Sequence, residues 1–250
     1  RALRRPGRVA RADWPAAVFA PEQLGLKVEG AFISMPETVC LYDEAYLDAQ
    51  LKQVDAGATL RLFDAVGSTN SAMTSDAQTQ DVGGNVYVAE FQTAGRGRRG
   101  RDWIGDFGRN VTMTVGFSFR RQLADLGGLS CVVGLALIQV LENLGVKAQL
   151  KWPNDVWVDD KKLAGILVEL VQTPRGATAV IGIGMNVDLS PEQMSKIDQE
   201  VVCLRGLGAA ISRQDLVVAI YQYVLANVDL FEREGFDRFI PAFDSVHRLH

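Results

Sequence analysis

Seven consecutive residues, Gly95 to Arg101, read GRGRRGR and place four arginines among three glycines. Glycine gives the backbone unusual conformational freedom, and the arginines repel one another when nothing neutralises them. A guanidinium group binds phosphate or carboxylate through charge-assisted hydrogen bonds worth roughly 1.5 to 3 kcal/mol each. The segment therefore predicts a mobile loop that closes over an anionic ligand. A solvated charge run or an unspecific nucleic-acid patch would have the same composition.

A second polar segment reads KWPNDVWVDDKKLAGIL. Pro153 restricts the backbone immediately after Trp152. Asn154 and Asp155 then lie at a rigid strand end, where polar groups can face a ligand. Lys162 opens the next strand, and the small residues that follow it would let a ligand approach the backbone closely. The ordinary interpretation stays open, in which Lys162 is a surface hairpin lysine, Trp152 a core residue and Asp155 a turn residue.

Two shorter motifs add polar groups. Ser68, Thr69 and Asn70 offer two hydroxyls and an amide at the start of an expected helix, which suits a neutral polar ligand but also suits a plain helix cap. Asn186 ends the run GIGMN and can donate a hydrogen bond to a phosphate or occupy a turn. This run lacks the third glycine and the following helix of a dinucleotide-binding fingerprint, and the chain contains no P-loop motif.

Composition limits the class of protein. With 250 residues, of which 48% are hydrophobic, the chain can form one large domain with an appendage. A formal net charge of −4 argues against a protein that coats nucleic acid over its whole surface. We find no apolar run near the roughly 20 residues of a membrane-spanning helix, and therefore expect no membrane association.

Cysteine and histidine usage excludes further chemistry. Cys40, Cys131 and Cys203 are far apart and form no CxxC pair, so we expect neither a disulfide framework nor a zinc site. Reduced cysteines fit the cytoplasm. The two histidines, His247 and His250, lie at the end of the chain, which argues against histidine catalysis and predicts no metal site.

The strands and helices that must position these residues are predicted from the spacing of apolar residues and from the turn and capping residues between them. Alternating or continuous apolar runs predict strands at residues 60–66, 85–93, 110–119, 148–152, 155–160, 162–172 and 177–188. Apolar periodicity predicts helices at residues 43–54, after Ser68, at 129–145, at 213–234 and towards Phe243, with Gly145 and Gly235 as C-terminal caps. A tight turn is expected at Asp160 and Lys161. The order of elements indicates a mixed sheet with helices on its faces, and places the arginine loop between two strands.

The first 38 residues contain Pro6, Pro15, Pro21 and Pro36, which interrupt any long helix. The opening RALRRPGRVAR is basic like a transit peptide, but it lacks an initiating Met and a following apolar core, so we interpret it as the edge of a longer protein. The segment GLKVEGAFISMP reads as a strand, a glycine turn and a second strand, as in the wing of a winged helix.

In chain order, the segments STN, EFQTAGRGRRGR with Trp103, KWPNDVWV, KLAGILVE and GIGMNV closely resemble the biotin protein ligase family, of the bifunctional ligase/repressor type. The match covers roughly residues 58–245. The resemblance implies an α+β fold like that of class II aminoacyl-tRNA synthetases, with a mixed, largely antiparallel sheet and flanking helices. It also implies an enzyme that joins biotin to ATP as biotinyl-5′-AMP and transfers biotin to a lysine of biotin carboxyl carrier protein of acetyl-CoA carboxylase. Mg²⁺ would be carried on the ATP phosphates.

The resemblance also implies roles for individual residues. Arg98 and Lys162 match the catalytic positions, which would offset repulsion between the biotin carboxylate and the phosphates. The residues that match biotin-binding positions are Ser68, Thr69, Asn70, Gln92, Gly95, Arg96, Gly97, Arg98 and Lys162. The residues expected near the nucleotide are Arg99, Arg101, Asn154, Asp155 and Asn186. Trp103 and Trp152 are expected either to wall the ligand sites or to belong to the core.

The resemblance divides the chain into a partial winged-helix remnant at residues 1–40, a linker helix at 41–57 and a catalytic domain at 58–250. The family's C-terminal β-barrel is expected to be absent, which puts the transfer step in question. We expect no DNA binding by this chain, because Pro15 and Pro21 disfavour a recognition helix. Pairing of two copies as a homodimer is implied by the family. The rival hypotheses are a lipoate-type acyl ligase and a DNA-binding regulator.

Overall fold

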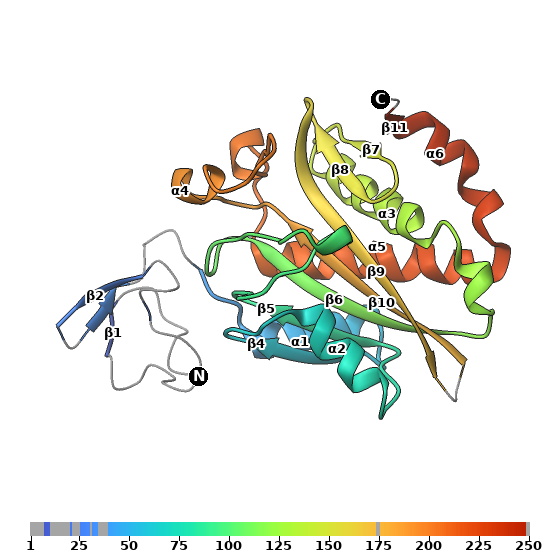
Figure 1. The fold of residues 1–250 in the computed structure, drawn as a ribbon, viewed down its shortest axis with the longest axis horizontal. Helices are drawn as coiled ribbons and strands as arrows, with labels where there is room; N and C mark the ends of the chain where they lie inside the picture. Colours follow the sequence, from blue (N-terminus) through green and yellow to red (C-terminus); the bar gives the residue numbers. More distant parts are fainter. Residues whose placement is uncertain are drawn as a thin grey trace.

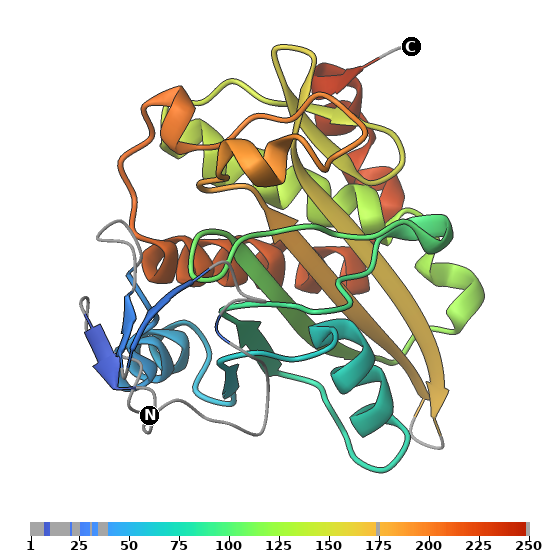
Figure 2. The same ribbon diagram turned by 60° about the vertical axis from the view of Figure 1, so that its left-hand side comes forward.

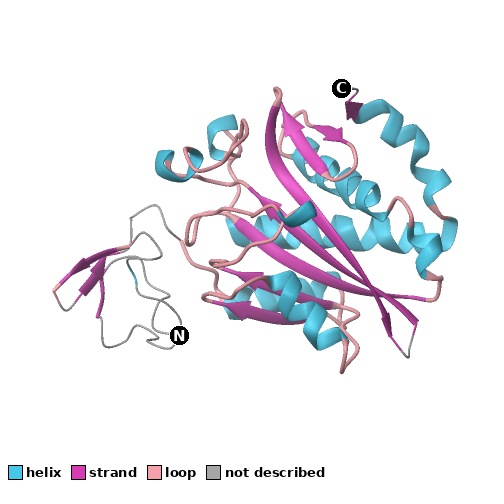
Figure 3. Ribbon diagram, in the orientation of Figure 1, coloured by secondary structure: helices cyan, strands magenta, loops and turns pink. Residues whose placement is uncertain are grey.

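The structure, a computed structural model, describes residues 8–10, 21, 26–30, 32–34, 40–173 and 176–248. Its main feature is an eight-stranded sheet with the order β11-β7-β8-β9-β10-β6-β5-β4 (Figures 1 and 3). The strands are β4 Thr59–Phe63, β5 Asn85–Ala89, β6 Val111–Phe119, β7 Gln149–Lys151, β8 Asp155–Val158, β9 Lys161–Thr173, β10 Gly176–Met185 and β11 His247–Arg248. Only the pairs β4–β5 and β11–β7 are parallel in this sheet, so the predicted mixed, largely antiparallel fold is confirmed.

Helices cover both faces of the sheet. They are α1 Glu44–Val54, α2 Thr69–Ala77, α3 Leu129–Asn143, α4 Pro191–Met194, α5 Arg213–Glu234 and α6 Ile240–Val246. Side chains alternate between faces along a strand. In β10, Ala179 and Ile181 join the large core cluster that contains α3 and α5, whereas Val180 joins a smaller cluster with Met73 of α2. The face that carries α2 also carries the arginine loop (Figure 2).

Helix α3 forms the centre of the large cluster. Together with the short 3₁₀ turn before it, α3 forms the segment Leu123–Asn143, which by length and composition is apolar enough to cross a membrane. The expectation that the chain has no such run was therefore wrong. The apolar window of this segment is 61% buried inside the protein, where α3 packs on α5 and on β9. The apolarity is therefore that of a core helix with protein on most of its surface.

The turn between β8 and β9 differs from the prediction. Val158 pairs with Lys161, and the two residues between them, Asp159 and Asp160, both have positive φ, 46° and 63°. Two positive φ values suit the twist of a two-residue hairpin turn. The prediction of a turn at Asp160 and Lys161 was thus wrong by one residue, and Lys161 already belongs to β9.

Near the N-terminus, β1 Arg8–Ala10, β2 Lys27–Glu29 and β3 Phe32–Ser34 form a three-stranded antiparallel sheet. Gly30, with φ of 62°, stands in the turn between β2 and β3, where the wing-like strand pair is expected. The expectations about Pro6, Pro15 and Pro36 lie outside the described residues. The proposed domain boundaries at residues 40 and 57 stay predictions.

Candidate functional site

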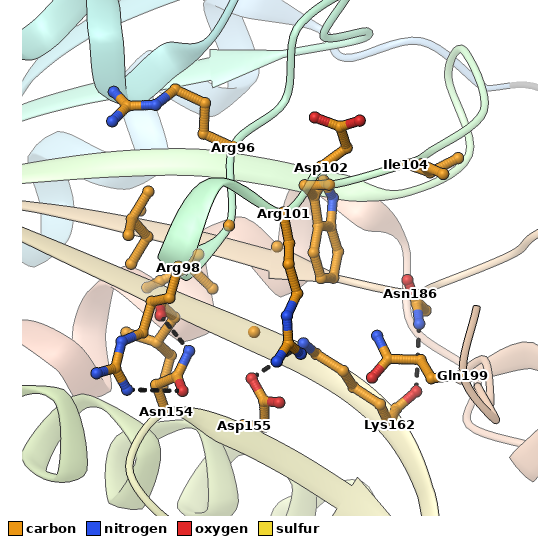
Figure 4. Close-up of a pocket in the computed structure, with 18 of the residues that line it drawn as sticks. Arg96, Arg98, Arg101, Asp102, Ile104, Asn154, Asp155, Lys162, Asn186 and Gln199 are labelled. Atoms are coloured by element: carbon orange, nitrogen blue, oxygen red, sulfur yellow. Dashed lines mark hydrogen bonds and ion pairs between the residues drawn. The ribbon is translucent and has the colours of Figure 1, made fainter. Parts of the chain in front are cut away.

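A cavity of about 870 Å³ opens on the α2 face of the sheet. The arginine loop lies on one side, and β9 and β10 form its floor (Figure 4). The predicted site residues that line this cavity are Ser68, Thr69, Asn70, Gln92, Arg96, Gly97, Arg98, Arg99, Arg101, Asn154, Asp155, Lys162 and Asn186. Trp103 and Trp152 line it too. Segments more than 100 residues apart in the sequence are thus brought to one place.

Gly95 is the predicted site residue that does not belong to this lining. It is buried, and a Cβ atom there would lie 2.4 Å from the carbonyl oxygen of Trp103. Its lack of a side chain therefore allows the two arms of the loop to approach each other. The expectation that Gly95 lets a ligand approach the backbone stays a prediction.

Glycines shape the cavity floor. A Cβ atom at Gly184 would lie 2.3 Å from the indole of Trp103, and one at Gly165 would lie 3.2 Å from the same ring. These two glycines are register partners on β10 and β9. Gly182 is the next residue of β10 on this face. A Cβ atom there would lie 2.2 Å from the side-chain oxygen of Asn70. The floor is thus flat enough for Trp103 and Asn70 to lie directly on the sheet.

The arginine loop has a defined backbone. Gly97 N–H donates to the Arg101 carbonyl at 2.7 Å, and Trp103 N–H donates to the Gly95 carbonyl at 2.9 Å, so the loop closes like a hairpin. Arg99 has φ of 57° at its tip. The arginine side chains diverge: Arg101 reaches towards Asp155 and Lys162, whereas Arg96 points away from them (Figure 4).

The start of α2 supplies neutral polar groups at one end of the cavity. Thr69 donates through its backbone N–H and its hydroxyl to the side-chain amide oxygen of Gln92, Oε1, at 2.8 and 3.0 Å. The Thr114 hydroxyl lies 2.8 Å from the Thr69 hydroxyl and 2.7 Å from Asn70 Oδ1. Ser68 caps α2 through the Ser71 N–H, as predicted. Thr69, Asn70 and Thr114 are buried and bonded to one another, and with the half-buried Gln92 they form a network of uncharged polar groups.

The other end of the cavity is cationic. Lys162 Nζ lies 3.0 Å from Asp155 Oδ1, and both side chains are mostly buried. Arg98 donates to Asn154 Oδ1 at 3.1 Å, while the Asn154 amide nitrogen donates to the Ile166 carbonyl at 2.9 Å. Asn154 is thereby held on β9 and offers its oxygen to the loop. Arg98, from the arginine loop, and Lys162, from β9, line the same cavity.

Asn186 has a structural contact as well as a place in the lining. It is buried, and its amide nitrogen donates to the Lys162 carbonyl at 3.3 Å (Figure 4). The Lys162 backbone also pairs with the segment after α4, since its N–H donates to the Glu200 carbonyl at 3.0 Å. Lys162 is therefore fixed from two sides.

Several lining residues were missed from the sequence. The missed lining residues include Lys151, Trp157, Lys196, Ile197, Asp198, Gln199 and Val201. Thr114 and Glu169 do not line the cavity themselves, but each contacts the lining residue Asn70. Strand alternation places Gly165, Leu167 and Glu169 on one face of β9, which was an available signal for Glu169. The segment 196–201 carried no motif, and only the fold brings it to the cavity.

Among the described residues, no group of three or more His, Cys, Asp or Glu side chains is placed to hold a metal ion. The site can bind a ligand that is neutral and polar at one end and anionic at the other. The guanidinium and ammonium groups at the cationic end can stabilise negative charge that develops during a transfer between a carboxylate and a phosphate.

Comparison with known proteins identifies relatives of this chain. Residues 62–186 match the model of the biotin/lipoate A/B protein ligase family. The chain is 33% identical over 236 residues to the bifunctional ligase/repressor BirA of Escherichia coli strain K12, across 94% of this chain and 70% of that protein. It is 37% identical over 181 residues to the biotin–[acetyl-CoA-carboxylase] ligase of Mycobacterium tuberculosis, across 67% of this chain and 63% of that protein.

Solved structures agree in fold. The biotin protein ligase of Aquifex aeolicus in complex with biotin and ATP superposes with a TM-score of 0.65 at 27% identity, over 76% of this chain and 78% of that one. The biotin protein ligase of Leishmania major in complex with biotinyl-5-AMP gives a TM-score of 0.60 at 27% identity, over 77% and 84% of the two chains.

Proposed function

The chain belongs to the biotin/lipoate A/B protein ligase family, and from this we propose that it joins biotin to ATP and then transfers biotin to a lysine of a biotin carboxyl carrier protein. It is a biotin protein ligase like its relatives. The observation that supports the residue assignment is the division of one cavity into a neutral polar end at the start of α2 and a cationic end around Arg98 and Lys162.

Biotin fits this division in chemical terms. Its ureido ring is neutral and needs donors and acceptors in a close-fitting pocket, which Ser68, Thr69 and Gln92 would supply. The side-chain oxygen of Gln92 already accepts hydrogen bonds from Thr69, which would leave the side-chain amide nitrogen of Gln92 to donate to the ring. The biotin carboxylate would then extend towards the cations.

The first reaction joins two anions. A carboxylate oxygen of biotin attacks the α-phosphorus of ATP, and the bond from that phosphorus to pyrophosphate breaks. Arg98 and Lys162 would offset the repulsion between the reactants and stabilise charge in the transition state. Arg99, Arg101, Asn154, Asp155 and Asn186 would lie along the nucleotide. Since Asp155 already pairs with Lys162, Mg²⁺ would arrive on the phosphates and need no dedicated protein cage.

The second reaction needs a protected intermediate. Biotinyl-5′-AMP is a mixed anhydride that water can hydrolyse, so closure of the arginine loop would preserve it until the carrier lysine attacks the acyl carbon and AMP leaves. Within the part of the chain that the structure describes, the Arg98 guanidinium is held by one hydrogen bond to a neutral amide. Arg98 can exchange this hydrogen bond for one to a phosphate at little cost in free energy, because a guanidinium binds a charged acceptor more strongly than a neutral one.

The name of the Mycobacterium tuberculosis relative, biotin–[acetyl-CoA-carboxylase] ligase, supports the biotin-accepting part of acetyl-CoA carboxylase as the carrier. The exposed Cys40 and buried, unpaired Cys131 and Cys203 support a reducing location such as the cytoplasm. A homodimer and the lack of DNA binding stay predictions, which sedimentation and a salt-dependent DNA-binding assay would test.

Exchange of labelled pyrophosphate into ATP tests the proposed function. We expect exchange with biotin and none with lipoate or octanoate, and a loss of roughly 100-fold or more in Lys162→Ala. Lys52→Ala removes a surface lysine that pairs with Asp48, and serves as the matched control with parent activity. Exchange with lipoate alone would identify a lipoate-type acyl ligase instead. No exchange with any acid, together with steeply salt-dependent DNA binding, would favour the DNA-binding regulator.

A further inference from the structure

Glu169, on β9, contacts the arginine loop and the start of α2 at the same time. Arg96 reaches both of its carboxylate oxygens, Nη2 to Oε1 at 2.9 Å and Nη1 to Oε2 at 3.5 Å. Asn70 Nδ2 donates to the same Oε2 at 3.0 Å. Arg96 Nη1 also donates to the Ser71 hydroxyl at 3.1 Å. One carboxylate thus connects three segments of the chain.

The two flanks of the arginine loop are held differently. Arg96 forms a bidentate pair with a carboxylate that is 24% exposed, and such fork-shaped pairs are among the stronger hydrogen-bonded contacts in proteins. Among the described residues, the Arg98 guanidinium has one hydrogen-bond partner, the uncharged Asn154 amide oxygen. An anionic ligand competes more readily for Arg98 than for Arg96, because Arg96 is already neutralised.

Glu169 also separates the charges along the cavity. It lies seven residues from Lys162 on the same strand, which corresponds to about 23 Å at a rise of about 3.3 Å per residue. Its carboxylate offsets the positive charge of Arg96 close to Asn70, which lines the neutral polar end of the cavity. Asn70 is oriented by the same contact, since its amide nitrogen faces Glu169 and the Leu167 carbonyl while its oxygen faces Thr114.

We infer that Glu169 is a positioning residue for the ligase reaction: it anchors the Arg96 flank of the loop to the sheet, so that only the part from Arg98 onward moves onto the phosphates. The inference rests on the proposed function for its catalytic consequence. The anchor itself is a property of the free protein, and a measurement without substrate can test it.

Limited trypsin digestion, with the cut sites identified by mass spectrometry, measures the anchor directly. Trypsin must take the arginine side chain into its own pocket, so a paired Arg96 resists cleavage. We expect initial cleavage after Arg96 to be about fivefold faster in Glu169→Gln than in the parent chain, as an ion pair of about 1 kcal/mol implies. Arg96→Lys keeps a trypsin site but cannot form the bidentate pair, and we expect faster cleavage there as well. Glu234→Gln removes a surface partner of Arg238 and controls for the charge change.

Kinetics then test the catalytic consequence. In Glu169→Gln we expect the KM for biotin to rise about fivefold and biotinyl-5′-AMP to escape faster, with kcat for pyrophosphate exchange changed less. If Glu169 acts mainly through Arg96, the same substitution loses most of its effect in an Arg96→Met background, where only the Asn70 contact is left to remove.

Equal cleavage after Arg96 in the parent, Glu169→Gln and Arg96→Lys chains would overturn the inference. A full fivefold loss from Glu169→Gln in the Arg96→Met background would also overturn it. If the parent chain shows no biotin-dependent exchange, the proposed function fails, while the digestion result still decides whether Glu169 anchors the loop.

Discussion

At the scale of single residues, three glycines without side chains shape the floor of the site. Gly165, Gly182 and Gly184 leave the sheet bare where Trp103 and Asn70 lie on it. The indole nitrogen of Trp103 is buried and has no hydrogen-bond partner among the described residues, so the packing of the ring against glycine determines its place. Trp103 also lies with its ring centre 5.9 Å from Lys162 Nζ. A substitution at these glycines that moves Trp103 should therefore also disturb Lys162 at the cationic end of the cavity.

Gly184→Ala tests the role of the floor. The added methyl group would lie 2.3 Å from the Trp103 ring, so Trp103 must move and overpacking should cost about 1 to 3 kcal/mol in the free energy of unfolding. We expect weaker biotin binding, measured by calorimetry, in a chain that still folds. Gly127→Ala is the matched control, because a Cβ there meets nothing within 4 Å. Parent-like biotin affinity in Gly184→Ala would contradict this account.

Arg98→Gly tests retention of the intermediate. It removes the Asn154 contact and the cation that would cover the acyl-phosphate, so we expect an intact fold and escape of biotinyl-5′-AMP at least tenfold faster than in the parent chain. Release of labelled adenylate after rapid filtration measures the escape. Arg120→Gly, at an exposed loop position outside the cavity lining, should retain it normally. If Arg98→Gly holds its adenylate as tightly as the parent chain, the role assigned to Arg98 is wrong.

At the scale of elements, a buried ion pair joins the start of α5 to the end of β5. Arg213 Nη2 lies 2.7 Å from Glu90 Oε2 and 2.6 Å from the Cys40 carbonyl, and the Tyr42 N–H donates to Glu90 Oε1 at 2.6 Å. Burial alone lowers the pKa of Arg213, but Tyr42 and Glu90 more than offset this and raise it, so the guanidinium stays charged. The segment that leads into α1 is thereby fixed to the catalytic sheet.

Glu90→Gln should therefore destabilise the protein strongly. It leaves the buried guanidinium without a compensating charge, and we expect a loss of about 3 to 5 kcal/mol in the free energy of unfolding, measured by urea denaturation. Glu234→Gln breaks an exposed pair with Arg238 and should cost about 1 kcal/mol or less. A similar small loss for both variants would show that the buried pair contributes no more than a surface one.

At the scale of the whole molecule, burial distinguishes the three thiols. Cys40 is exposed, whereas Cys131 and Cys203 are buried in the core. Burial raises the pKa of both the Cys131 and the Cys203 thiol, so each holds less reactive thiolate at neutral pH than an exposed cysteine does.

A thiol-reactive chromophore should report this difference. At pH 8 we expect one equivalent to react rapidly in the folded protein and three in denaturant. Cys40→Ser should abolish the rapid equivalent and leave the slow ones unchanged. Rapid labelling of two or three thiols in the folded chain would contradict the burial of Cys131 and Cys203.

Local signals predicted most elements of this fold. The helix caps Ser68 and Gly235 are where the sequence indicated, alternation of apolar residues located β6, and a largely apolar run located β10. The motifs in their chain order indicated a biotin ligase through their resemblance to that family. These inferences succeeded because each depends on a few neighbouring residues.

The sequence by itself thus predicted most of the elements, and its resemblance to a known family indicated the class of fold and the reaction. Only the tertiary structure decided which partner each polar group takes: Arg96 pairs with Glu169, 73 residues away, and Arg98 with Asn154, 56 residues away. It also placed Gly95 against the Trp103 carbonyl and brought the segment 196–201 to the cavity. The physical reason is that strand register and helix packing set these distances, and periodicity along the chain specifies which face a residue occupies but not what lies opposite it.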